Sequence, residues 1–255
     1  LKDSEFGFFF IPGIGDSRDI KLLRDNGGNF IRIGTSVEGF KEARKFIQQA
    51  KKLKIKFWIN LMKSYVYSYE EFAEISRVAL LEGAEGIYLV DSAGGMLPED
   101  VGNYISTAKE KLTSETSVNF KLGFHGHENL SLGTACALSA VQNGADILDG
   151  SLYGIGRSIG NSPIETLAMI IKKSGYSISI DPWRLADLAD KTVKPYLENR
   201  WRKSSIEQAL GYKEIHSNYL EEIINFSNEK KINSRDLILS LSEKAKMSVT
   251  KKDLD

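Results

Sequence analysis

The sequence is poor in cysteine and carries no excess of charge of either sign. Its 255 residues include one cysteine, Cys136, which excludes an intrachain disulfide and favours a reducing compartment such as the cytoplasm. The 34 basic and 34 acidic side chains cancel, so no whole-chain field favours nucleic acid or an anionic membrane as a partner. Cys136 lies among small and apolar residues of an expected helix, which is typical of a packed core thiol rather than a nucleophile.

The sequence also lacks a long apolar run. No segment approaches the roughly 20 apolar residues that span a bilayer. The run Phe6–Ile11 stops at Pro12 and is too short for the core of a secretion signal. The chain begins with Leu1, directly before an expected interior strand, and we therefore expect residues upstream of it.

Apolar stretches alternate with amphipathic stretches over most of the chain. Five strands are expected at 6–11, 30–34, 55–62, 86–92 and 146–151, and a sixth leads from Phe120 into two histidines. Helices are expected at about 16–26, 38–53, 69–82, 98–112, 130–143 and 163–174. Six strand–helix units at this spacing indicate an α/β protein with a parallel sheet.

After Gly175 the pattern changes to helices without strands between them. They are expected at about 183–199, 206–210, 217–230 and 234–246, with apolar side chains at helical spacing. The sequence therefore predicts two domains, an α/β domain over residues 1–175 and an α-helical domain over residues 176–255.

Two of the three histidines, His125 and His127, lie two residues apart where a strand meets a helix. Side chains on a strand alternate between faces, so both rings point the same way and can reach one ion. Neutral imidazole is the commonest protein ligand for divalent metals. Asp91 and Ser92 also follow a strand, at the edge where α/β sheets place their sites, although such residues also serve as caps and turn formers.

A glycine-rich stretch, Gly154–Glu165, follows the last expected strand. Its spacing is Gly-x-Gly-x-x-x-Gly, which differs from the dinucleotide-binding pattern, and it contains no Gly-Lys-Ser/Thr phosphate loop. A loop whose backbone closely approaches a ligand or a metal is favoured, and a tight turn without a ligand is the alternative.

Three motifs in this order resemble one superfamily, the metal-dependent lyases and synthases related to hydroxymethylglutaryl-CoA lyase, isopropylmalate synthase and 4-hydroxy-2-oxovalerate aldolase. The motifs are Asp91-Ser-Ala-Gly-Gly-Met96, His125-Gly-His-Glu-Asn-Leu-Ser-Leu-Gly133 and Gly154-Ile-Gly-Arg-Ser-Ile-Gly-Asn-Ser-Pro-Ile-Glu165. The aldolases are the most similar branch, because Pro12-Gly-Ile-Gly15 and Leu210-Gly-Tyr212 also resemble segments of these enzymes. The resemblance covers nearly the whole chain.

The resemblance implies a (β/α)8 TIM barrel, with residues 1–175 forming strands 3–8 of the family barrel, followed by a C-terminal α-helical domain. A barrel without two strands exposes two sheet edges. The first strand of the family carries Asp-(Val/Thr)-Thr-Leu-Arg-Asp-Gly, which supplies a metal-ligand aspartate and a substrate arginine, with a catalytic histidine nearby in the aldolases. Nothing like it occurs here, so we expect roughly the first quarter of the protein to be absent from this chain.

The resemblance also implies an activity, namely cleavage or formation of a 4-hydroxy-2-oxoacid, with pyruvate and an aldehyde as products and a metal-stabilised enolate between them. His125 and His127 would hold the divalent metal, Mn²⁺ or Mg²⁺, with the missing aspartate, and Asn161 would approach it. Ser92 would contact the pyruvate moiety, and Asp91, taken as a catalytic residue, would support the site through bonds to the metal ligands.

Two residues depart from the aldolase pattern. His216 stands where these aldolases have a second tyrosine, four residues after the one that matches Tyr212. It is interpreted as an altered substrate contact or a proton donor, with a helix-surface histidine as the alternative. Glu128 stands where they usually have histidine. Both departures suggest a substrate other than the usual aromatic-degradation intermediate.

Two other functions remain open from the sequence. One is an acetyl-CoA-dependent Claisen-type synthase of the isopropylmalate synthase kind, because the glycine-rich motif occurs there too. The other is a non-catalytic subunit that scaffolds a partner through its helical domain. The resemblance further suggests an acylating aldehyde dehydrogenase partner and a homo-oligomer, with neither nucleic acid nor membrane as a partner.

Overall fold

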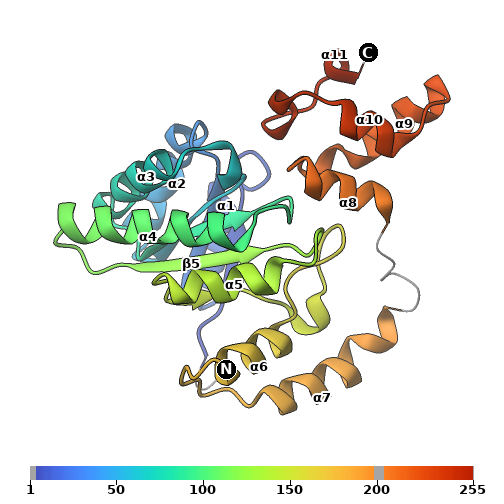
Figure 1. The fold of residues 1–255 in the computed structure, drawn as a ribbon. Coiled ribbons are helices and arrows are strands. Elements are labelled where there is room, and N and C mark those ends of the chain that lie inside the picture. The colour runs from blue at the N-terminus through green and yellow to red at the C-terminus, as the bar shows by residue number, and fades with distance from the viewer. Residues whose placement is uncertain (1–3, 198–203, 255) are drawn as a thin grey trace. The chain divides into compact units, whose positions relative to one another are not determined.

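The computed structural model describes residues 4–197 and 204–254 (Figure 1). In this part of the chain, six strands form one sheet whose spatial order follows the sequence, from β1 to β6. The pairs β1–β2, β2–β3 and β3–β4 are parallel, with Ile33 opposite Ile59 and Ile59 opposite Ile87. The prediction of an α/β protein with six strands is confirmed.

The strands are β1 Gly7–Phe10, β2 Phe30–Thr35, β3 Lys56–Leu61, β4 Gly86–Asp91, β5 Lys121–Gly126 and β6 Ile147–Leu148. The α-helices are α1 Ser17–Asp25, α2 Phe40–Lys52, α3 Tyr69–Leu81, α4 Pro98–Glu115, α5 Gly133–Gln142, α6 Ile164–Lys173, α7 Pro182–Thr192, α8 Ser205–Tyr212, α9 Leu220–Lys230, α10 Ser234–Ser240 and α11 Lys251–Leu254. Short 3₁₀ helices are η1 Ser64–Val66, η2 Leu152–Gly154, η3 Lys194–Tyr196, η4 Ser217–Tyr219 and η5 Glu243–Lys246.

The contacts within the chain divide it into two compact units. The first comprises residues 1–90, 103–123 and 143–147, and the second comprises residues 91–102, 124–142 and 148–255. The carboxyl ends of β4, β5 and β6 therefore belong to the same unit as helices α5 to α11. The predicted domains 1–175 and 176–255 follow a different division and stay a prediction.

Alternation along the strands builds the core of the first unit. In β2, β3 and β4, every second residue is a fully or almost fully buried apolar side chain, namely Ile31, Ile33, Phe57, Ile59, Leu61, Ile87 and Leu89. Since successive side chains on a strand point to opposite faces, these residues form one continuous apolar layer. Helix α2 presents a matching stripe of buried residues, Phe40, Ala43, Phe46, Ile47 and Ala50, at helical spacing.

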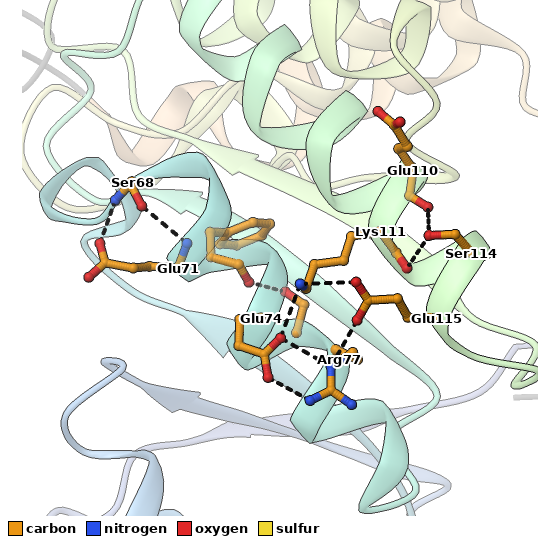
Figure 2. Close-up of polar contacts among 10 residues, drawn as sticks. Ser68, Glu71, Glu74, Arg77, Glu110, Lys111, Ser114 and Glu115 are labelled. Atoms are coloured by element: carbon orange, nitrogen blue, oxygen red, sulfur yellow. Dashed lines mark hydrogen bonds and ion pairs between the residues drawn. The ribbon is translucent and has the colours of Figure 1, made fainter.

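Capping residues set where several helices begin. The Asp16 side chain caps α1, and the Asp181 side chain caps α7. Helix α3 begins at a capping box, in which the Ser68 hydroxyl accepts from the Glu71 amide and the Glu71 carboxylate accepts from the Ser68 amide (Figure 2).

Two of the predicted C-terminal helices are shorter than expected. The helix predicted over 183–199 ends at Thr192, and the short η3 helix, which contains Pro195, follows it. Its last two predicted residues lie outside the described part of the chain. The helix predicted over 234–246 divides into α10 and η5. None of the helices in residues 4–197 and 204–254 combines the length and the apolarity needed to cross a bilayer.

A network of charged side chains links α3 to the C-terminal half of α4 within the first unit (Figure 2). Arg77 lies 2.6 Å from a Glu74 oxygen and 3.4 Å from a Glu115 oxygen, and Lys111 lies 3.3 Å from Glu74 and 3.2 Å from Glu115. The hydrogen bond from Arg77 is the largest cause that lowers the pKa of Glu74 to about 2. Because the carboxylates are half-exposed, the network adds little to stability beside the apolar layer.

Two isoleucines of the first unit differ in burial. Ile59 is 0% exposed and Ile14 is 84% exposed, and both are in the first unit. Ile59→Ala is expected to lower the free energy of unfolding by about 2–5 kcal/mol, because it removes apolar contacts and leaves a cavity. The matched control Ile14→Ala is expected to change it by less than about 0.5 kcal/mol. Equilibrium denaturation of both variants checks this, and similar losses in the two would contradict the assigned core.

Candidate active site

Asp91, at the end of β4, holds the loop that follows it. Its Oδ1 accepts from the amides of Gly94 and Gly95 at 2.9 and 3.2 Å, and its Oδ2 accepts from the amide of Met96 at 3.0 Å. Gly94 has a positive φ of 66°, which lets the chain turn its amides toward the carboxylate. Burial is the largest influence on this group and raises the pKa of Asp91 to about 6, against the lowering effect of the three amides.

His125 and His127, at the end of β5, lie side by side. Their ring centroids are 5.2 Å apart, and the ring planes are inclined at 80°. His125 is oriented by Asp149, whose Oδ2 lies 3.2 Å from the Nδ1 of His125. A carboxylate that holds one ring nitrogen leaves the other nitrogen of the imidazole to face a ligand.

His127 is buried and uncharged. Burial is the main cause that lowers its pKa to about 3, and the charges of His125, Arg157 and His216 act in the same direction. Its Nδ1 atom is buried and has no hydrogen-bond partner among the described residues. A buried polar atom is normally satisfied, so this nitrogen points to a partner that completes it. A neutral imidazole with an open nitrogen is the form that binds a metal cation.

The glycine-rich loop pairs with the end of β5 through the backbone. The amide of Glu128 donates to the carbonyl of Gly160 at 3.0 Å, and the amide of Ser162 donates to the carbonyl of Gly126 at 3.3 Å. His127 and Asn161 consequently face each other in an antiparallel bridge. The structure thus brings Asn161, predicted from a separate motif, next to the predicted histidine ligand.

Glycines allow the segments of the site to approach closely. The amide of Leu130 donates to the carbonyl of Gly94 at 3.0 Å, and a Cβ atom on Gly94 would lie 2.7 Å from the amide nitrogen of Asn129. A Cβ atom on Gly95 would lie 2.1 Å from the carbonyl oxygen of Gly211, in α8. Side chains at these positions would separate the Asp91 loop, the histidine segment and α8, all of which belong to the second unit.

Arg157 joins three segments of the site, and no pattern in the sequence singled it out. Its two terminal nitrogens contact groups that are distant in sequence. Nη1 lies 2.7 Å from the Nε2 and 3.2 Å from the Nδ1 of His216, and it donates to the Oδ1 of Asn218 at 3.0 Å. Nη2 donates to the carbonyl of Ser92 at 3.1 Å. His216 is 6% exposed, so it is not the surface histidine that the sequence left open. The one feature of the sequence that could have pointed to Arg157 is its position inside the glycine-rich motif.

Two acidic residues of the motifs fasten the backbone. Glu128 accepts from the amide and the hydroxyl of Thr134 at 2.9 and 2.7 Å, and so anchors the first turn of α5. Glu165 accepts from the amide of Tyr153 at 3.1 Å through both of its oxygens, and so ties η2, where the glycine-rich loop begins, to α6. Both carboxylates have structural roles in these contacts.

The local donors fit a metal in part. His125 and His127 supply two imidazoles, and the side-chain amide of Asn161 lies in the adjoining loop, where its Nδ2 donates to the carbonyl of Ile155 at 3.2 Å. Among the described residues, no group of three or more His, Cys, Asp or Glu side chains is placed to hold a metal ion. The open Nδ1 of His127 is the observation in favour of a cation, and a complete set of protein ligands is absent from the described part of the chain.

Known proteins are similar to this chain in sequence and in fold. The pattern of the HMGL-like family matches residues 32–192. A 4-hydroxy-2-oxovalerate aldolase from Marinomonas sp. is 30% identical over 96% of this chain and 71% of its own length. Another, from Mycolicibacterium gilvum, is 32% identical over 93% of this chain and 66% of its own length. The chain thus spans 66–71% of the length of these two relatives.

Solved structures support the barrel fold. The N-terminal domain of an aldolase candidate from Bacteroides vulgatus matches with a TM-score of 0.73 at 21% identity, covering 89% of this chain and 75% of that chain. The carboxyl transferase domain of Rhizobium etli pyruvate carboxylase matches with a TM-score of 0.73 at 12% identity, covering 91% and 42%. At these identities, the likeness concerns the fold alone.

The family pattern covers more than half of the chain, and similarity at 30% identity over 96% of the chain accompanies it. The three motifs that carried the resemblance lie together in one compact unit. The chain therefore belongs to the HMGL-like family of enzymes, on its 4-hydroxy-2-oxovalerate aldolase branch.

Proposed function

We propose that the protein is a divalent-metal-dependent aldolase that cleaves or forms a 4-hydroxy-2-oxoacid, with pyruvate and an aldehyde as the products of cleavage. One observation carries the proposal, the buried and uncharged ring of His127 with its open Nδ1 beside the ring of His125. The names of the relatives support the same reaction.

In this proposal, His125 and His127 hold the cation, with Asn161 as a further oxygen donor nearby. A mixed set of nitrogen and oxygen donors suits Mn²⁺ or Mg²⁺. When bound, the cation supplies a Lewis acid for the negative charge that develops on the pyruvate half as the carbon–carbon bond breaks. Asp149 keeps the ring of His125 in one orientation, which lowers the cost of assembling the site.

The remaining residues position the substrate. Asp91 fixes the loop that carries Ser92, and Ser92 contacts the pyruvate half. The contacts of Asp91 support a positioning role, because both of its oxygens bind loop amides. His216 is buried, and Arg157 contacts both its ring and the carbonyl of Ser92. His216 stays the proposed catalytic residue of the C-terminal segment. The aldehyde dehydrogenase partner and the homo-oligomer stay predictions.

Metal removal is the first test of this function. EDTA treatment is expected to abolish pyruvate release from a panel of 4-hydroxy-2-oxoacids, and Mn²⁺ or Mg²⁺ is expected to restore it, with pyruvate followed through lactate dehydrogenase. His127→Ala is expected to weaken metal binding by about 100-fold in calorimetry, because a ligand is lost. His216→Ala, the matched control, is expected to keep metal affinity.

Two results would contradict this proposal. One is unchanged metal affinity in His127→Ala. The other is acetyl-CoA-dependent thiol release with a 2-oxoacid in place of pyruvate release, which would favour the Claisen-type synthase.

The raised pKa of Asp91 predicts a pH dependence of stability in the metal-free protein. Between pH 3.8, the ordinary pKa, and about pH 6, the folded state keeps a proton on Asp91 that the unfolded chain has released. The contribution of Asp91 to the free energy of unfolding is therefore fully present below pH 3.8 and is lost as the pH rises through about 6. Asp91→Asn does not titrate. The free energy of unfolding of the wild type, minus that of Asp91→Asn, is therefore expected to fall by up to about 3 kcal/mol between about pH 4 and 7.

Denaturation of both proteins over this pH range checks the sign, and carboxyl ¹³C NMR of Asp91 checks the pKa itself. Taking the difference cancels the other titrating groups, among them Glu74, whose lowered pKa acts in the opposite direction. A difference that grows with pH would mean that the three loop amides outweigh burial.

A further inference from the structure

A backbone hydrogen bond sets the tautomer of the neutral His216 ring. The residue lies directly before η4, and the amide of Asn218 donates to its Nδ1 at 3.2 Å. A ring nitrogen that accepts a hydrogen bond carries no proton, so in the neutral imidazole the proton is on Nε2. His216 is 6% exposed, and this bond is therefore shielded from water.

The guanidinium of Arg157 stands over the face of this ring. Its Nη1 lies 2.7 Å from the Nε2 and 3.2 Å from the Nδ1 of His216. A donor that approached one ring nitrogen along its lone pair would lie much farther from the other, so the similar distances place Nη1 above the ring plane. A guanidinium is planar and packs well against such a face. The contact therefore restricts rotation of the imidazole and leaves its bond to Asn218 in place.

The guanidinium is itself anchored on two sides of the ring. Nη1 donates to the Oδ1 of Asn218 at 3.0 Å, and Nη2 donates to the carbonyl of Ser92 at 3.1 Å. Ser92 lies in the loop that the Asp91 carboxylate holds, and all of these residues belong to the second unit. Because both terminal nitrogens already have partners, Arg157 holds the neighbouring ring with little further loss of side-chain freedom.

The backbone around Arg157 is held as well. Ser158 has a left-handed φ of 56°, which is uncommon for a residue other than glycine. Its hydroxyl accepts from the Nδ2 of Asn129 at 2.9 Å and lies 3.3 Å from the Oε1 of Glu207 in α8. Burial is the main cause that lowers the pKa of His127, and a hydrogen bond with the backbone of Arg157 acts in the opposite direction. One residue thus contacts His127 through its backbone and His216 through its side chain.

From these contacts we propose that Arg157 is a positioning residue, which holds the imidazole of His216 in one orientation and one tautomer for the reaction. The proposal rests on the proposed aldolase function, in which His216 is the catalytic residue. It adds a side chain that acts through His216 and does not bind the substrate. A ring that is held in advance loses less freedom in the transition state, so the effect falls on kcat and leaves KM nearly unchanged.

Imidazole ¹⁵N NMR reads the state of the ring without turnover. The chain has three histidines, so His216 is assigned by the signals that His216→Gln lacks. At about pH 8, where an ordinary imidazole is neutral, the wild type is expected to show one sharp set of His216 signals with the proton on Nε2. Arg157→Ala is expected to broaden or average them, because the ring gains freedom. Arg184→Ala, which removes an exposed arginine of the same unit, is the control and is expected to leave them unchanged.

Kinetics test the consequence for the reaction. Arg157→Ala is expected to lower kcat for pyruvate release by about 10- to 100-fold and to change KM by less than about threefold. In the His216→Gln background it is expected to cause less than about a threefold further loss, because the ring that Arg157 holds is already gone. Arg157→Lys keeps the charge but has no planar face, so it is expected to restore only part of kcat.

A second variant covers the case in which Arg157→Ala misfolds. Asn218→Ala removes one anchor of the guanidinium and keeps the backbone amide that bonds to the ring. It is expected to broaden the His216 signals and to lower kcat in the same way as Arg157→Ala, but less strongly, because the anchor at Ser92 remains.

The outcomes separate this inference from the proposed function. A His216 ring that loses its order in Arg157→Ala or Asn218→Ala supports the inference even if no 4-hydroxy-2-oxoacid is cleaved, in which case only the aldolase function fails. Sharp His216 signals of the same tautomer in these variants overturn the inference. A rise in KM with unchanged kcat overturns it as well, since Arg157 would then bind substrate, and so do additive losses from Arg157→Ala and His216→Gln.

Discussion

Backbone hydrogen bonds at the end of β5 hold the candidate site together. The amides of Glu128 and Ser162 pair this segment with the glycine-rich loop, and the amide of Leu130 pairs it with Gly94 of the Asp91 loop. Because these bonds use main-chain groups, they fix the spacing of the loops and leave the side chains to do chemistry. The glycines of the motifs follow from this arrangement, since a Cβ atom at Gly94 would press against the chain beside it. Three motifs that are separate in sequence thus become one site.

Much of the fold follows from periodicity in the sequence. Strand alternation and helical spacing located the six strands and most of the helices, because burial on one face leaves a regular pattern. The strand predicted over 146–151 is observed only at Ile147–Leu148, since the residues after it enter the paired glycine-rich loop. In the second unit, the Nδ2 of Asn129, after β5, donates to the carbonyl of Glu207 in α8 at 3.0 Å, and such contacts between distant segments leave no mark in local periodicity.

The candidate site was predictable only where chemistry and spacing coincide. His125 and His127 could be paired because two residues along a strand return to the same face. The neighbour of Asn161 could not be deduced, because it depends on how a loop folds back on the strand. Arg157 could not be predicted for the same reason, since its partners His216 and Ser92 are 59 and 65 residues away in sequence. Asp91 shows a different limit, because an aspartate after a strand has the same sequence signal whether it meets a substrate or binds its own loop.

Glu128 constrains how this site can change by mutation. Its carboxylate anchors the start of α5 through both donor groups of Thr134, while its own amide pairs with Gly160. A histidine at this position has no carboxylate to offer the N–H of Thr134, so the helix would begin with an exposed donor unless residue 134 changed as well. Residues 128 and 134 are therefore expected to covary among related sequences, as a pair that sets the helix start independently of the neighbouring His127.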